Sequence, residues 1–199
     1  MRTRTLLAAG AAAVVIGVAG CGGSSDSGEG QATGAVDPNQ AEASPPGDIP
    51  DNQAFVAYSP LGAHYSVKVP EGWARTQSGG AVTFTDMLNA IRIETTPAAA
   101  APTPSEAKRT DLPQLARSVK GFQPGSVDIV NRQGGRALRI TYLADAKPDP
   151  VTGKTGTDAV ERYVLFHNGK DLVLTVSGPK GADNVDPWMI VTDSVRWSQ

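Results

Sequence analysis

Apolar and polar side chains alternate along several short stretches of the chain beyond residue 54. The alternating stretches are Tyr65–Val69, Val82–Thr85, Ile91–Glu94 and Leu138–Tyr142. Because successive side chains of a strand point to opposite faces, this alternation predicts antiparallel strands with one covered face. Two other stretches, Tyr163–Phe166 and Leu172–Val176, are more continuously apolar. They predict central strands that are covered on both faces.

Turn residues between these stretches predict hairpins. Asn168-Gly169 separates two apolar runs and is the residue pair most typical of a tight hairpin turn. Gly134-Gly135 separates residues 127–130 from residues 137–142 in the same way. Pro70-Glu71-Gly72-Trp73 predicts a turn that is closed by a large apolar side chain.

Two segments predict helices. Thr103, Pro104 and Glu106 have the spacing of a helix N-cap, a first-turn proline and a third-position acid. Apolar residues then follow at helical spacing, at Leu112, Leu115, Ala116 and Val119. Pro113 interrupts this stretch, so we expect two short helical pieces.

The second helical segment lies near the end of the chain. Asp186-Pro187 predicts a helix start, and a helix continuing to Asp193 would bury Trp188 and Val191. Residues 194–197 predict a last strand. Strands, a helix, two hairpins, a helix and a short strand together predict an α+β domain over residues 54–199, an antiparallel β-sheet with helices packed on it.

The first twenty residues have the pattern of an export signal. Arg2 and Arg4 precede an apolar run, Leu6–Val18, which is short for a membrane span, and small residues lead to Cys21. This arrangement resembles the bacterial lipobox. The resemblance implies removal of residues 1–20, a lipid attached at Cys21, and anchoring on the extracytoplasmic face of a cell membrane. The alternatives are an ordinary export signal with a chance cysteine and a buried structural cysteine.

Residues 21–53 differ in composition from the rest of the chain. They contain no Trp, Tyr, Phe, Lys or Arg, and they are rich in Gly, Ser, Pro and acidic residues. Such a segment buries too little apolar surface to offset the entropy lost on ordering. We therefore predict a disordered acidic tether between the anchor and the domain.

Several tracts of the domain resemble a known fold family. YSVKVPEGW, VTFTD, AIRIETTP and the ending GADNVDPWMIVTDSVRW are similar to the PsbP-like fold and to the actinobacterial LpqN/LpqT-type lipoproteins. The resemblance covers about residues 55–199 and is structural. It implies a binding or adaptor role and transfers no catalytic residue.

Composition and motifs exclude several classes of function. A net charge of −2 provides no basic surplus for nucleic acid, and one Cys with two His does not make a disulfide framework or a multi-ligand zinc site. Gly153-Lys154-Thr155 lacks the glycine that a phosphate-binding loop needs five positions earlier, where Pro148 stands. We expect no cofactor, no nucleotide and no metal.

Weaker candidate sites remain. Asp145, Asp149 and Asp158 flank a long loop and are candidates for weak calcium binding, although solvated loop acids are the commoner case. His64 or His167 with a serine and an acid, or Glu94 with Glu161, would supply catalytic groups only if the fold joined them.

Three functions follow from these patterns. We favour a non-enzymatic binding module that contacts an unidentified protein or envelope component through a sheet face or the 145–157 loop. A carrier of lipid or another apolar molecule would place Trp73, Phe84 and Trp188 around a pocket. A cell-envelope hydrolase is the third reading. Trp73, Trp188 and Trp197 are interpreted first as core anchors, with a ligand pocket as the alternative.

Overall fold

The computed structural model describes residues 47–148 and 153–198, all within one unit, Glu42–Gln199. The predicted signal segment, Cys21, most of the tether and Asp149 lie outside the described residues. No helix in the described ranges is long and apolar enough to cross a membrane.

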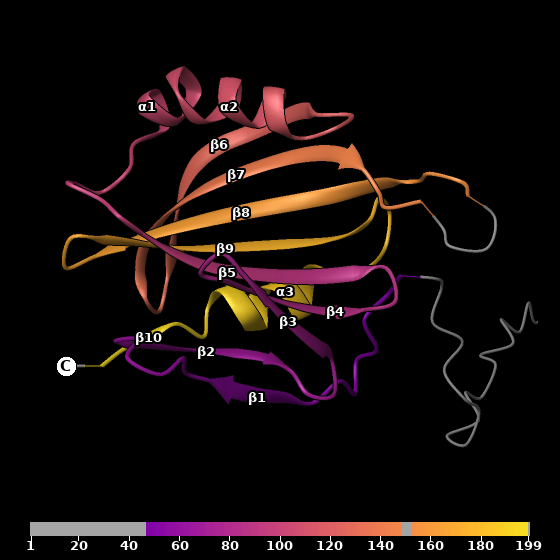
Figure 1. The fold of residues 1–199 in the computed structure, drawn as a ribbon, viewed down its shortest axis with the longest axis horizontal. Helices are drawn as coiled ribbons and strands as arrows, with labels where there is room; N and C mark the ends of the chain where they lie inside the picture. The colour runs from indigo at the N-terminus through magenta and orange to yellow at the C-terminus, as the bar shows by residue number, and fades with distance from the viewer. Residues whose placement is uncertain (1–46, 149–152, 199) are drawn as a thin grey trace, which may run out of the picture. The chain divides into compact units, whose positions relative to one another are not determined.

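The chain forms ten strands and three helices in these ranges (Figure 1). The strands are β1 (Phe55–Tyr58), β2 (Tyr65–Pro70), β3 (Ala74–Ser78), β4 (Ala81–Asp86), β5 (Asn89–Pro97), β6 (Gln123–Arg132), β7 (Gly135–Asp145), β8 (Thr157–His167), β9 (Lys170–Pro179) and β10 (Arg196–Trp197). The helices are α1 (Pro104–Arg109), α2 (Asp111–Ser118) and α3 (Val185–Thr192). The α+β class and the predicted order of elements are confirmed.

Seven strands form one antiparallel sheet in the order β3-β4-β5-β9-β8-β7-β6. The β8–β9 turn is Asn168-Gly169, as predicted, and both residues have positive φ angles, 46° and 76°. The β6–β7 hairpin is also confirmed, but its ladder closes at Arg132 and Gly135. Its turn therefore consists of Gln133 and Gly134, one residue earlier than the predicted pair.

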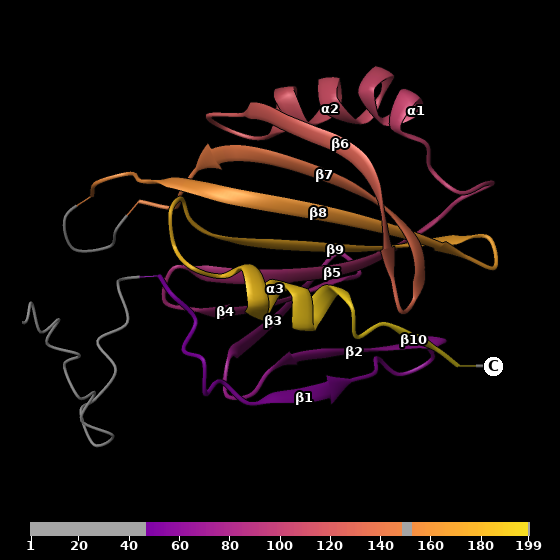
Figure 2. The same ribbon diagram turned by 180° about the vertical axis from the view of Figure 1, so that it is seen from behind.

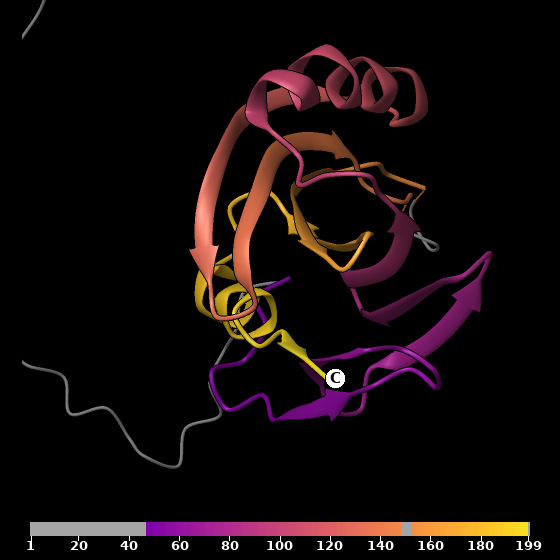
Figure 3. The same ribbon diagram turned by 90° about the vertical axis from the view of Figure 1, so that its left-hand side faces the viewer.

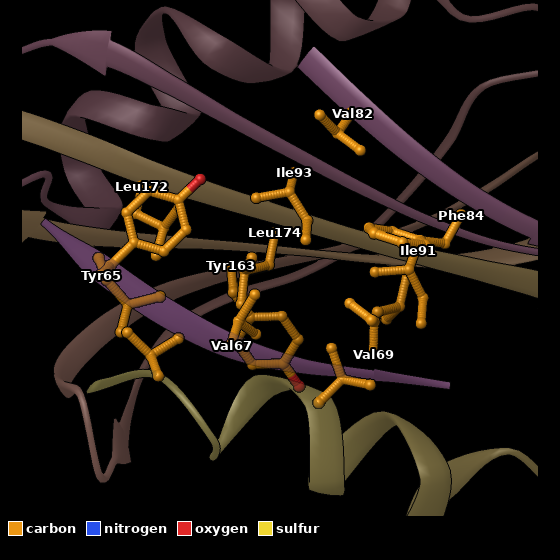
Figure 4. Packing of buried hydrophobic residues seen from close by; sticks show 14 of the residues in the cluster. Tyr65, Val67, Val69, Val82, Phe84, Ile91, Ile93, Tyr163, Leu172 and Leu174 are labelled. Carbon is orange, nitrogen blue, oxygen red and sulfur yellow. The ribbon is translucent and has the colours of Figure 1, made fainter. Parts of the chain in front are cut away.

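A second, three-stranded sheet in the order β1-β2-β10 faces the large sheet. The sequence pattern predicted one sheet, and the structure divides the strands between two. Tyr65, Val67 and Val69 of β2 point toward the apolar side chains of the large sheet (Figure 4). Helix α3 lies between the two sheets and buries Val191 in the same core (Figure 2).

Helices α1 and α2 cover the opposite face of the large sheet, over β6, β7 and β8 (Figure 1). Ala107 of α1 is buried there against side chains such as Leu138 and Ile140. The Thr103 hydroxyl accepts a hydrogen bond from the Glu106 amide at 3.3 Å, which confirms the predicted N-cap. The two helical pieces divide at Thr110, and Pro113 lies in the first turn of α2, where a backbone N–H has no helical partner to lose.

The aromatic residues proposed for an apolar pocket belong to the core between the sheets. Phe84 is buried, and Trp73 and Trp188 pack against the same cluster. Core packing therefore describes Trp73 and Trp188 better than the alternative of a pocket around Trp73, Phe84 and Trp188.

The ordered domain begins before residue 54. Ile49 is only 4% exposed, and its amide donates a hydrogen bond to the Asn184 side chain at 2.8 Å. The side chains of Asn89 and Asn184 both donate to the Gly47 carbonyl, at 3.0 and 2.9 Å. The expectation of disorder is therefore wrong for residues 47–53. The buried Ile49 side chain and the hydrogen bonds from Asn89 and Asn184 hold this segment against the domain.

Candidate functional site

A cleft of about 920 Å³ opens between the two sheets. It lies where the β1–β2 loop, the β3–β4 turn, the β8–β9 turn and the C-terminal residues meet. This end of the domain faces the viewer in Figure 3. The volume is in the range of pockets that hold small organic ligands.

Apolar side chains of the core form the floor of the cleft. Val82, Ile93 and Leu172 line it and are all buried. They come from neighbouring strands of the large sheet, β4, β5 and β9, and belong to the core cluster between the two sheets. This core therefore also supplies an apolar surface at the bottom of the cleft.

Trp197 forms one wall and is held by two other elements. Its indole Nε1 donates a hydrogen bond to the Gly134 carbonyl at 2.7 Å, and its ring stacks on His167 with centroids 4.4 Å apart. Tyr65, its partner across the β2–β10 ladder, meets it edge-on at 6.4 Å. Burial raises the pKa of Tyr65, which favours the protonated form of its phenol.

The rim of the cleft is basic. Arg75, Lys170 and His64 are exposed residues that line it, and half-buried His167 lies beside them. The Arg75 guanidinium lies 5.2 Å from the centre of the Tyr58 ring, which in turn packs edge-on against Phe84 at 5.1 Å. Among the described residues, no Asp or Glu lines this cleft.

Both histidines therefore belong to one cleft, which the sequence did not show. Within residues 47–148 and 153–198, neither imidazole forms a hydrogen bond with a serine or a carboxylate. His167 instead stacks on Trp197. The described part of the cleft lacks the paired groups that the hydrolase hypothesis requires.

Glu94 and Glu161 lie on opposite faces of the large sheet. Glu94 bonds to Arg92 and Arg162 at 3.0 and 3.2 Å on the face that carries the helices. Glu161 accepts a hydrogen bond from Tyr163 on the other face. The fold does not bring these two carboxylates together, so they form no acid–base pair.

The loop acids considered for calcium are only partly described. Asp145 forms an ion pair with Lys120 at 3.8 Å, and burial raises the pKa of Asp158, which disfavours its charged form. Asp149 lies outside the described residues. Within the parts of the chain that are described, no three His, Cys, Asp or Glu side chains cluster as metal ligands.

Sequence reasoning missed the residues that make the cleft. Arg75 and Lys170 have the pattern of ordinary solvated strand residues, and Tyr58 lies on a strand that no alternation predicted. These positions are separated by many residues in sequence, and only the folded domain places them around one cleft. Trp197, His64 and His167 are the lining residues that the sequence analysis singled out, the first as a core anchor or part of a pocket and the two histidines as catalytic candidates.

The fold is an α+β domain that is similar to the PsbP fold. No protein-family model matches the chain, and no curated protein matches it. Cyanobacterial PsbP from Synechocystis is structurally similar, with a TM-score of 0.55 and 13% identity over 73% of this chain and 93% of that protein.

Two weaker structural similarities were also found. LpqN of Mycobacterium tuberculosis, described as involved in cell envelope biogenesis, has a TM-score of 0.40 and 14% identity over 75% of this chain and 87% of its own. A Ran-binding protein of Saccharomyces cerevisiae has a TM-score of 0.44 and 12% identity, covering 64% of this chain and 78% of that protein. At these identities the comparisons establish the fold alone.

Proposed function

We propose that this chain is a lipid-anchored, extracytoplasmic binding module that holds a small ligand in the cleft between its two sheets. The single observation that carries the binding role is the cleft itself, with an apolar floor, aromatic walls and a volume of about 920 Å³. The role is non-enzymatic in this proposal, since binding requires no reacting group. Contact with a protein partner through the 145–157 loop stays a prediction, because residues 149–152 lie outside the described ranges.

The position of the cleft suits a tethered module. Gly47, the first described residue, lies beside Pro179 at one end of β9, whereas Leu172 at the cleft lies near the other end of that strand. Seven residues of strand separate the two points, which corresponds to about 23 Å. The described domain therefore begins far from the cleft.

The lipid anchor is tested by metabolic labelling with palmitate. We expect the wild-type chain to take up the label and to fractionate with membranes, and Cys21→Ala to lose both properties. An unlabelled, freely secreted wild-type chain would refute the anchor without affecting the cleft.

The cleft is tested with N-phenyl-1-naphthylamine, an uncharged fluorescent probe, added to the mature chain from residue 21 onward. Gln77→Trp places a bulky ring at an exposed position that lines the cleft, and we expect it to abolish binding. Thr76→Trp is the matched control, because the adjacent side chain on the same exposed strand points to the opposite face. Equal binding by wild type and both variants, or none by wild type, would reject the cleft as the binding site.

A further inference from the structure

We infer that the ligand of this cleft is a single-chain anionic amphiphile, with a carboxylate, sulfate or phosphate group at the rim and an apolar body on the floor. This inference rests on the proposed function, because it names the chemical class of the ligand in the same cleft. The ligand that we infer is a dissolved molecule and not a membrane surface.

The charge distribution supports the acidic group. The chain has 20 acidic and 18 basic residues, yet the described lining of the cleft contains Arg75 and Lys170 and no carboxylate. Neither of these cations forms an ion pair within the described residues. Two exposed cations whose charge no carboxylate of the described residues neutralises create a local positive potential that favours an anion.

The geometry at Arg75 places one of these charges beside the apolar wall. Its guanidinium lies over the Tyr58 ring, 5.2 Å from the centre, and Tyr58 is supported by Phe84. A cation held against an aromatic face loses side-chain freedom before the ligand arrives. Its remaining N–H donors match the oxygen atoms of a carboxylate, sulfate or phosphate.

The depth of the apolar residues distinguishes a dissolved ligand from a bilayer. Val82, Ile93 and Leu172 are buried at the floor, whereas the exposed rim is mainly basic or polar. Leu61 is the exception, a fully exposed side chain in the β1–β2 loop at the edge of the cleft. A bilayer contact needs apolar side chains on the outermost surface, whereas a bound amphiphile inserts its own apolar body.

Paired fluorescent probes test the charge requirement on the mature chain. The anionic probe is 1-anilinonaphthalene-8-sulfonate, and N-phenyl-1-naphthylamine has nearly the same rings without the sulfonate. We expect the double variant Arg75→Gln/Lys170→Gln to weaken binding of the anionic probe by about tenfold and to leave the neutral probe unchanged within about twofold. Arg136→Gln/Lys108→Gln is the control, since both residues are exposed and neither lines the cleft. Near-UV circular dichroism checks that all variants are folded.

The outcomes separate the two proposals. If the double variant binds both probes as wild type does, or loses both equally, the anionic ligand class is overturned while the Gln77→Trp result decides the cleft independently. If wild type does not bind the neutral probe, the proposed function fails.

Two further measurements distinguish a dissolved fatty acid from a lipid headgroup in a membrane as the source of the acidic group. We expect dodecanoate to displace the anionic probe, and the unacylated chain not to sediment with phosphatidylglycerol vesicles. Failure of dodecanoate to compete, or sedimentation with the vesicles, would overturn the single-chain ligand.

Discussion

Two buried asparagine side chains join three distant segments of the chain. Asn184 is 2% exposed, and its amide donates to the Gly47 carbonyl and to the Asn89 side chain at 2.9 and 3.0 Å. Its oxygen accepts from the Ile49 amide at 2.8 Å. Gly178 lies against both amides, so a larger residue there would displace them. Buried polar groups of this kind are costly when their partners are removed.

We predict that Asn184→Ala lowers the free energy of unfolding by about 2–3 kcal/mol, because it leaves the Gly47 carbonyl and the Ile49 amide with fewer partners. Denaturant unfolding measures the change. Asn131→Ala, at an exposed position of β6, is the control and should stay within about 0.5 kcal/mol of wild type. Similar stability for the two variants would mean that the amide network contributes little.

The Asp128–Arg139 pair is a second residue-scale feature. The guanidinium donates Nε and Nη2 hydrogen bonds to the two carboxylate oxygens, both at 3.1 Å. The bond from Arg139 holds the pKa of Asp128 below its usual value. A carboxyl whose pKa is lowered by folding stabilises the protein above its unfolded pKa, and this contribution is lost as the pH falls through the folded pKa.

We therefore predict that Asp128→Asn destabilises the domain by about 0.5–1 kcal/mol at pH 7, the range for a partly exposed pair. The difference from wild type should shrink as the pH falls below about 4, where the wild-type carboxylate also becomes protonated. Unfolding curves at pH 7 and pH 3 measure it. A difference that is constant between these pH values would contradict the assignment.

At the scale of elements, the β6–β7 turn supports the C-terminal segment. The Gly134 carbonyl accepts the hydrogen bond from Trp197, and a Cβ atom at Gly134 would lie 2.8 Å from Val195 and 3.0 Å from Leu165. The turn therefore packs against buried side chains of β8 and of the segment between α3 and β10. Its close approach depends on the missing side chain of Gly134.

We predict that Gly134→Ala costs about 1–3 kcal/mol through overpacking, and that it shifts the fluorescence of Trp197 at the cleft wall. Gly156→Ala is the matched control, because a Cβ atom there meets only Ala146 at an ordinary 3.8 Å. Chemical denaturation followed by tryptophan fluorescence reports both effects. Equal free energies of unfolding for the two variants would show that the turn accommodates the extra methyl group without destabilising the domain.

At the scale of the whole molecule, the two core layers share the central strands. Leu174 of β9 is buried between the sheets, and its neighbour Val173 is buried under the helix-covered face. Strand β3, at the edge of the large sheet, is exposed along its whole length. Stability is therefore distributed unevenly across the sheet.

We predict that the amides of β9 exchange with deuterium more slowly than those of β3, by several orders of magnitude after correction for intrinsic rates. Exposing the amides of β9 requires breaking its pairing with β5 and β8 in the middle of the sheet. The edge strand β3 pairs only with β4, so its amides become exposed when that single pairing breaks. Hydrogen-exchange mass spectrometry resolves the two strands. Comparable protection in β3 and β9 would contradict this distribution.

Sequence patterns were sufficient to predict a feature where it depends on residues that are close together in the chain. The Asn168-Gly169 turn, the Thr103 cap and the alternation at Tyr65, Val67 and Val69 all follow from backbone geometry and side-chain period. They failed where the partner is distant. Ile49 was assigned to the tether because its flanking composition is polar, and only Asn184, which is 135 residues away in sequence, shows why it is ordered.

The sequence by itself determined the class of the domain and most of its strands and helices, because each of these depends on short-range patterns. Lipid attachment at Cys21 stays a prediction. Only the tertiary structure decided that the strands form two sheets, that Glu94 and Glu161 lie on opposite faces, and that Arg75, His64, His167 and Trp197 line one cleft. The physical reason is that sheet order and sheet-to-sheet packing depend on pairings between distant segments. Side-chain alternation along one strand carries no information about which strand lies beside it.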